Sequence, residues 1–228
     1  LLALCDVNGI NISKTELIQY NHWVETNFIG SNNGILDQAA NILCEDEHLM
    51  FMDCRTGEYE LIKKPKNMKD FEIVVVFSGL SKMLISTDYN NRVDECKVAA
   101  WIIQELNNEN RRLLKDTRLR DISPETYYKY KNIIPGKFVR RAEHFFTENQ
   151  RVIEGIEAWK KGDIQHFGEL MFESGKSSII NYESGCPELV TIYNILREAP
   201  GVYGARFSGA GYRGCCIGLI DPNYKKEI

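Results

Sequence analysis

The sequence has no long apolar run and no excess of basic residues. Its apolar stretches fall well short of the ~18–20 residues that a membrane-spanning helix needs. The 228 residues carry 28 Lys and Arg against 32 Asp and Glu, which gives a formal net charge of −4. This balance offers no electrostatic basis for binding nucleic acid or an anionic membrane. We therefore expect neither as a partner.

Spacings typical of metal sites and disulfide frameworks are also missing. The histidines, His22, His48, His144 and His166, lie far apart and form no pair at ligand spacing. The seven cysteines contain no Cys-x-x-Cys, and most lie in apolar segments. Such cysteines are typical of small buried side chains in a reducing compartment. We expect a cytoplasmic protein without metal-ligating residues in this chain.

The two ends of the chain show no start or stop signal of a domain. The chain begins Leu-Leu-Ala-Leu-Cys-Asp, without an initiator methionine or the basic region of a signal peptide. It begins inside an apolar helical pattern and stops soon after Asp221-Pro222, where a helix could begin. We expect a fragment of a longer protein.

Hydrophobic residues make up 43% of the chain, enough for the core of one large domain or two small ones. Helical spacing is expected over 1–6, 13–28, 34–43, 89–102, from 124, 137–160, 163–172 and 187–199, and strand patterns over 49–52, 59–62, 71–77, 202–207 and 215–220. Helices and strands follow one another without regular alternation. This order predicts an α+β fold.

Three local patterns give sharper expectations. Ser13 with Glu16 three residues later predicts a capping box at a helix start. The nearly continuous β-branched run at 71–77 predicts a strand buried on both faces. The polar, charged stretch 107–121 predicts an exposed connection.

Asp37 is the candidate reactive group of the segment Gly30 to Gln38, which reads Gly-Ser-Asn-Asn-Gly-Ile-Leu-Asp-Gln. A carboxylate in the first turn of a helix can be a cap. It can also be a catalytic base at the mouth of a cleft. Position and spacing by themselves favour the cap.

A glycine-rich loop, Gly209-Ala-Gly-Tyr-Arg-Gly214, joins the last two predicted strands. A dinucleotide site needs a helix after such a loop, and a strand follows here. A protein-kinase loop would need further motifs downstream, for which no chain remains. Two interpretations stay open: a loop whose backbone N–H groups cradle an anion, or a tight hairpin packed under another element.

Three separated stretches resemble the galactokinase family of the GHMP sugar kinases: Gly34-Ile-Leu-Asp-Gln38, Tyr89-Asn-Asn-Arg92, and Pro200 to Cys215 with the glycine loop. The family carries a G-I-M-D-Q-like segment, a Y-N-x-R segment and a G-A-R-x-x-G-G-G-F-G-G-C segment in that order. The run Arg140 to Val152 is similar to the family's long helix.

This resemblance implies a GHMP-kinase-like α+β fold, with helices packed on mostly antiparallel sheets and an active site between two lobes. The lobes would be residues 1–70, the remainder of the N-terminal lobe, and residues 71–228, the C-terminal lobe. It implies an ATP- and Mg²⁺-dependent sugar-1-kinase. The γ-phosphate of ATP would pass to the anomeric O1 of galacturonate or galactose.

The resemblance also implies roles for individual residues. Asp37 would be the catalytic carboxylate, Gly34 would leave room for the sugar, and Tyr89 would hydrogen-bond a sugar hydroxyl. Gly209, Gly211 and Gly214 would form the loop near the phosphates, and Arg213 could pair with a uronate carboxylate. Lys82 is a weaker candidate for that pairing, and Arg92 with Glu95 suits a surface or scaffolding pair.

The wording departs from galactokinases proper at two places. Phe207-Ser-Gly-Ala-Gly-Tyr-Arg-Gly214 and Phe77-Ser-Gly-Leu-Ser-Lys-Met-Leu84 look closer to galacturonokinases. The family's N-terminal sugar segment and its P-x-G-x-G-L-S-S-S-A phosphate loop are not in this sequence. The alternatives are therefore a catalytically silent sugar-binding or regulatory relative, and a truncated chain without activity of its own.

Overall fold

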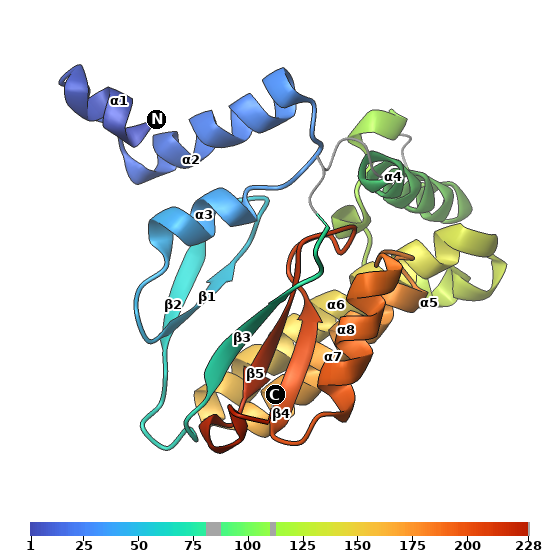
Figure 1. Ribbon diagram of the computed structural model, residues 1–228. Helices are drawn as coiled ribbons and strands as arrows, with labels where there is room; N and C mark the ends of the chain where they lie inside the picture. The colour runs from blue at the N-terminus through green and yellow to red at the C-terminus, as the bar shows by residue number, and fades with distance from the viewer. Residues whose placement is uncertain (81–87, 110–112, 228) are drawn as a thin grey trace. The chain divides into compact units, whose positions relative to one another are not determined.

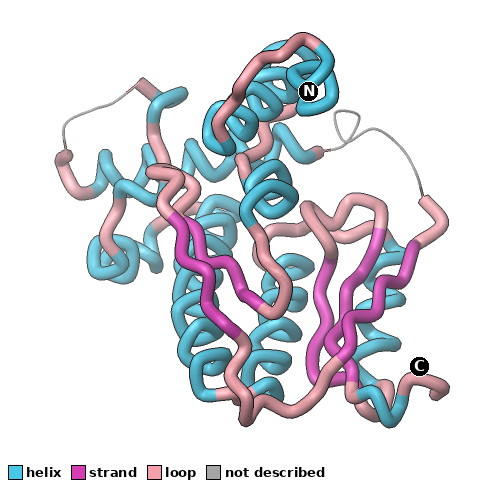
Figure 2. The backbone as a smooth tube through the Cα atoms, turned by 90° about the vertical axis from the view of Figure 1, so that its left-hand side faces the viewer, coloured by secondary structure: helices cyan, strands magenta, loops and turns pink. Residues whose placement is uncertain are grey.

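The computed structural model describes residues 1–80, 88–109 and 113–227. The chain divides into two compact units, Leu1–Lys66 and Asn67–Ile228. The strands form two separate sheets, an antiparallel pair in the first unit and a three-stranded antiparallel sheet in the second (Figure 2). Within the described residues, no helix is long and apolar enough to cross a membrane.

The first unit consists of short helices followed by a β-hairpin. Its elements are α1 (Leu2–Val7), α2 (Lys14–Trp23), a π-helix (Val24–Ile29), α3 (Leu36–Leu43), β1 (His48–Met52) and β2 (Tyr59–Lys63). Ile18 of α2 packs against Ala39 and Leu43 of α3, with Met50 and Met52 of β1 beside them. This small core fixes the orientation of α3.

The predicted capping box is confirmed at the start of α2. The Ser13 hydroxyl accepts the Glu16 N–H at 3.2 Å, and the Glu16 carboxylate accepts the Ser13 N–H at 2.9 Å. Two N–H groups that the helix itself leaves without partners are thereby satisfied.

The second unit combines a sheet with longer helices (Figure 1). Its elements are β3 (Glu72–Phe77), α4 (Tyr89–Leu106), α5 (Pro124–Tyr130), α6 (Gly136–Lys161), α7 (Ile164–Ile180), α8 (Pro187–Glu198), β4 (Val202–Phe207) and β5 (Cys215–Ile220), with short 3₁₀ turns between α4 and α6 and after β5. The strand order is β3-β5-β4. Both α7 and α8 pack against β4, and α6 packs against α7 and α4.

Close packing between α7 and β4 depends on two glycines that face each other. A Cβ on Gly168 would lie 2.1 Å from the Tyr203 carbonyl oxygen, and one on Gly204 would lie 2.1 Å from the Gly168 carbonyl oxygen. Backbone atoms cannot yield at that distance, so helix and strand touch only because both side chains are absent.

The expectation that the strand at 71–77 is buried on both faces is wrong. Ile73, Val75 and Phe77 are 58–64% exposed, while Val74 and Val76 on the other face pack into the core of the sheet and α8. Among the described strands, β3 pairs only with β5 and so lies at the sheet edge. The β-branched run reflects strand propensity, which does not report how many faces are covered.

Two further expectations need correction. The stretch 107–121 is not simply exposed: Thr117 and Leu119 are buried, and the Thr117 hydroxyl donates to the Lys97 carbonyl of α4 at 2.9 Å. The helix expected to end at 172 continues to Ile180; its buried face there consists of small residues such as Ser174 and Gly175, which give no apolar periodicity. Cys44 and Cys54 are exposed, whereas Cys5 and Cys216 are buried.

Candidate active site

Asp37 lies in the first turn of α3 without capping it. The N-cap residue is Ile35, no side chain caps the helix, and the Asp37 carbonyl oxygen accepts the Asn41 side chain at 2.8 Å. Helical spacing turns Gln38 and Ala39 inward and leaves Asp37 exposed. The cap that position alone favoured is therefore wrong, and the carboxylate remains open to a hydroxyl or cation.

The loop before Asp37 is anchored to the preceding helical segment. Gly30 ends the π-helix with φ 83°, and the Asn33 side chain donates to the Glu25 carboxylate. The His22 ring lies 2.9 Å from the Asn33 carbonyl oxygen. Gly34 is exposed, and a Cβ on it would meet no atom within 4 Å, so packing within the chain does not require glycine there.

The glycine loop closes the β4–β5 hairpin and is also open at its tip. Ser208 N–H donates to the Cys215 carbonyl at 2.9 Å, and Ser78 N–H donates to the Gly214 carbonyl at 2.9 Å. Gly209, Gly211 and Gly214 have φ of 78–86°, a region that L side chains rarely adopt. The loop is thus a tight hairpin whose conformation still presents backbone groups.

The three glycines of the loop differ in how closely other atoms surround them. A Cβ on Gly211 would lie 2.4 Å from the Phe207 ring, whereas one on Gly209 or Gly214 would meet nothing within 4 Å. The backbone N–H groups of Gly209 and Ala210 donate no hydrogen bond within the described residues. Open N–H groups of this kind can hold an anion.

Tyr89, the candidate sugar-binding tyrosine, lies at the start of α4. Tyr89, the first residue of α4, is half-buried. Burial raises the pKa of Tyr182, and the nearby Tyr89 and Tyr212 hydroxyls raise it further. Lys82 lies outside the described residues.

Tyr212 and Arg213 are the two bulky residues of the loop. The Tyr212 hydroxyl is buried and has no hydrogen-bond partner among the described residues. Burial raises the pKa of Tyr212 to about 12. Arg213 is half-buried.

Asp37 belongs to the other unit, so its approach to Tyr89 and the loop stays a prediction.

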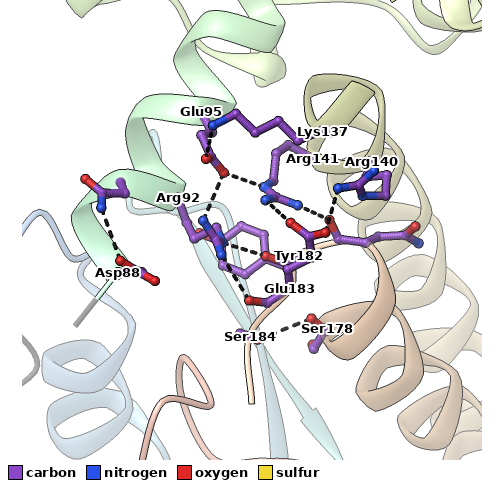
Figure 3. A network of polar contacts seen from close by, with 12 residues as sticks. Asp88, Arg92, Glu95, Lys137, Arg140, Arg141, Ser178, Tyr182, Glu183 and Ser184 are labelled. Atoms are coloured by element: carbon purple, nitrogen blue, oxygen red, sulfur yellow. Dashed lines mark hydrogen bonds and ion pairs between the residues drawn. The ribbon is translucent and has the colours of Figure 1, made fainter. Parts of the chain in front are cut away.

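Sequence reasoning missed a network of ion pairs centred on Arg141 of α6. The Arg141 side chain is fully buried and bonds Glu95 at 2.7 Å and Glu183 at 2.5 Å (Figure 3). Although burial opposes it, hydrogen bonds from Lys137 and Arg141 hold the pKa of Glu95 below its ordinary value. One signal in the sequence could have indicated that Arg141 is buried. Arg141 lies three residues after Phe138 and four before Phe145, which places it on the apolar face of α6.

Arg92 and Glu95 form a pair at 3.2 Å within this network, as part of the scaffold. The described residues hold no group of three or more His, Cys, Asp or Glu side chains placed to bind a metal ion.

Comparison with known proteins adds independent information on the family. Residues 153–228 match the family model "GHMP kinases C terminal". The chain is 44% identical to a galacturonokinase of Arabidopsis thaliana over 222 residues, which is 97% of this chain and 52% of that protein. It is 32% identical to a galactokinase of Thermosipho africanus over 215 residues, or 94% of this chain and 56% of that protein. The chain spans about half the length of the curated relatives it matches.

Solved structures show the same fold. The crystal structure of Lactococcus lactis galactokinase complexed with galactose aligns with a TM-score of 0.86 at 29% identity, over 99% of this chain and 56% of that chain. The crystal structure of L. major mevalonate kinase in complex with R-mevalonate aligns with a TM-score of 0.58 at 16% identity, over 99% of this chain and 55% of that chain, which is a likeness of fold alone. The predicted α+β GHMP-kinase fold is confirmed, and the chain belongs to the galactokinase family of the GHMP kinases.

Proposed function

We propose that the protein containing this chain is an ATP-dependent sugar-1-kinase that phosphorylates galacturonate at the anomeric O1, with galactose as the alternative substrate. The similarity to a galacturonokinase, 44% against about 32% for galactokinases, supports this order of preference. The observation that carries the proposal is Asp37, an exposed carboxylate in the family's catalytic segment that is not used as a helix cap.

In this proposal Asp37 receives the proton of the O1 hydroxyl, or orients that hydroxyl, as the oxygen attacks the γ-phosphate. An anomeric hydroxyl is more acidic than an ordinary alcohol, so a carboxylate suffices as base. Gly34, which packing does not require to be glycine, leaves space for the sugar beside the backbone. Phosphoryl transfer depends on such positioning and on neutralisation of phosphate charge.

In the second unit, Tyr89 would hydrogen-bond a sugar hydroxyl, and the N–H groups at Gly209 and Ala210 would face the phosphates or the sugar oxygens. Gly211 and Gly214 would keep the loop in its left-handed turns. ATP would supply the phosphoryl group and Mg²⁺ would neutralise its charge. The described residues form no metal-binding cluster, and the proposal assigns no ligand of Mg²⁺ to them.

Asp37→Asn tests the role of the carboxylate, because it keeps the side-chain shape and removes the charge. In the whole protein we expect kcat to fall by roughly 10²- to 10⁴-fold in a coupled assay of ADP release, the usual contribution of a general base. Asp6→Asn, which removes another exposed carboxylate of the first unit, is the matched control and should leave kcat unchanged. A kcat near that of the wild type in Asp37→Asn would refute the base assignment.

Arg213→Gly tests the choice of sugar. If the guanidinium pairs with the uronate carboxylate, its loss should lower kcat/KM for galacturonate by roughly tenfold or more and leave galactose nearly unaffected, since a charge-assisted hydrogen bond contributes about 1.5–3 kcal/mol. Equal losses on both sugars would rule out a carboxylate contact. Sugar binding without ADP release in the wild type would favour the silent relative.

A further inference from the structure

We propose that Arg92 and Arg141 are positioning residues, which hold the segment Asn181 to Cys186 and through it fix the glycine loop. The kinetic part of this proposal rests on the proposed function. The structural part does not, because it concerns how two elements of the second unit are held together.

The two arginines supply donors to three successive backbone carbonyls after α7. Arg141 Nη1 donates to the Asn181 carbonyl at 2.6 Å, and Arg92 donates to the Tyr182 carbonyl through Nε at 2.9 Å and to the Glu183 carbonyl through Nη2 at 3.3 Å. The segment leaves the helix here, so the helix provides no partners for these oxygens. Arginine side chains of α4 and α6 therefore supply the hydrogen-bond donors that a continuing helix would have supplied (Figure 3).

The arginines are themselves fixed by carboxylates on both sides. Glu95 accepts Arg141 Nε at 2.7 Å, Arg92 Nη1 at 3.2 Å and Lys137 Nζ at 2.7 Å. Glu183 accepts Arg141 Nη2 at 2.5 Å, and its other oxygen accepts Arg140 at 2.5 Å. A fully buried guanidinium is stable only when its charge is paired, and a planar fork with several donors meets this demand better than lysine.

The segment so held carries the glycine loop. Ser184 N–H donates to the Ser178 carbonyl at 3.0 Å, and Cys186 N–H donates to the Gly211 carbonyl at 3.2 Å. The Phe207 ring lies close to both the segment and the loop. A Cβ added to Gly185 would lie 2.9 Å from this ring, and one added to Gly211 would lie 2.4 Å from it. A shift of the segment would therefore disturb its contacts with the loop.

The same network reaches the other candidate sugar-binding element. Arg92 lies one helical turn after Tyr89 on α4, so the residue that holds the segment shares a rigid helix with it. The Tyr182 ring also packs against the His144 ring of α6, with 4.8 Å between ring centroids and a tilt of 32° between the rings. Arg92 thus couples the place of Tyr89 to the place of the glycine loop.

Hydrogen exchange of the whole protein, followed over the residues of this chain, tests the structural part. Arg92→Gln removes the guanidinium that donates to both carbonyls, and Lys97→Gln is the matched control because it removes a partly exposed ion pair from the same helix. We expect exchange of the Cys186 and Ser208 amides, which donate to the Gly211 and Cys215 carbonyls, to accelerate roughly tenfold or more in Arg92→Gln, as expected for loss of a charge-assisted hydrogen bond. Exchange in α6 and in the sheet should not change. Unchanged exchange at the loop would overturn the proposal.

Arg141→Lys provides a second variant, and it should accelerate exchange at Asn181 to Ser184 even where it lowers overall stability. If its exchange rises equally over the whole unit, Arg92→Gln decides, since Arg92 is less deeply buried, with 15% of its side chain exposed. Arg92→Lys restores the charge beside Glu95 but cannot serve two carbonyls at once. We expect it to recover only part of the loop protection.

Kinetics of the whole protein test the positioning role. Arg92→Gln should lower kcat/KM roughly tenfold or more for galacturonate and galactose alike, whereas Lys97→Gln should leave it unchanged. The thermal unfolding midpoints of the two variants should lie within a few degrees of each other. Accelerated loop exchange without a kinetic effect would reject the positioning role. A wild-type protein that phosphorylates no sugar would refute the proposed function, and the exchange result would still decide whether the arginines hold the loop.

Discussion

His144 should remain neutral far below the pH at which a free histidine takes up a proton. It lies on α6 with Nδ1 at 3.0 Å from the Ser177 hydroxyl of α7, and its ring packs against the Tyr182 ring at a tilt of 32°. Burial lowers the pKa of His144 to about 4. Glu148 opposes this shift, while the charges of Arg151, Arg206 and Arg141 add to it.

The sign and size of the effect follow from proton linkage. The folded pKa lies below the ordinary value of 6.5, so the unfolded chain binds more protons between these two values. The stability contributed by neutral His144 is complete above pH 6.5, falls between 6.5 and about 4, and is lost below that. At about 1.4 kcal/mol per pKa unit, the loss is about 3 kcal/mol at most.

An NMR titration of the His144 ring protons measures the folded pKa directly, and His144→Gln identifies the resonance. Urea unfolding of the second unit at pH 7.5 and 4.5 should then show a smaller acid destabilisation in His144→Gln than in the wild type. His166→Gln, which removes an exposed histidine from α7, is the control. A midpoint near 6.5, or equal acid destabilisation in wild type and His144→Gln, would refute the reasoning.

Three further predictions concern packing and helix capping. Gly168→Ala should destabilise the second unit by about 3 kcal/mol or more in urea unfolding, because its Cβ would meet the Tyr203 carbonyl at 2.1 Å; an effect below 1 kcal/mol would show that α7 can move away. Val74→Thr should cost about 1–2 kcal/mol by placing a hydroxyl in the core, and Val75→Thr on the exposed face less than about 0.5, with equal effects contradicting the one-sided burial of β3. Ser13→Ala should weaken α2 by about 1 kcal/mol, measured by amide exchange of its first turn, and an unchanged rate would exclude the capping box as a source of stability.

Local signals in the sequence were sufficient for most elements. The capping box at Ser13, the cap at Asp163 and the proline after Cys186 each mark a helix start that the structure contains. These signals work because a helix end must satisfy its own N–H groups within a few residues. The β4–β5 hairpin was equally predictable from its glycine loop.

The candidate site was predictable only as separate motifs. Tyr89 begins α4, and Arg213 and the three glycines lie in the loop between β4 and β5. Their roles, like that of Asp37, stay predictions. Asp37 was favoured as a cap because caps depend on the neighbouring residues alone. The structure shows Ile35 at the N-cap position, a detail of backbone direction that residue type does not determine.

The sequence by itself determined the α+β class, the positions of most helices and strands, and the family resemblance, because caps, periodicity and motifs are encoded over a few neighbouring residues. Only the tertiary structure decided that one face of β3 is exposed, that Gly168 meets Gly204, and that Arg141 is buried between Glu95 and Glu183. The glycine contact joins residues 36 positions apart in the sequence, and the pair of Arg141 with Glu95 joins residues 46 positions apart. The order of strands in the sheet decides which faces are covered. Burial and charge pairing depend on what lies across the fold, which neighbouring residues do not specify.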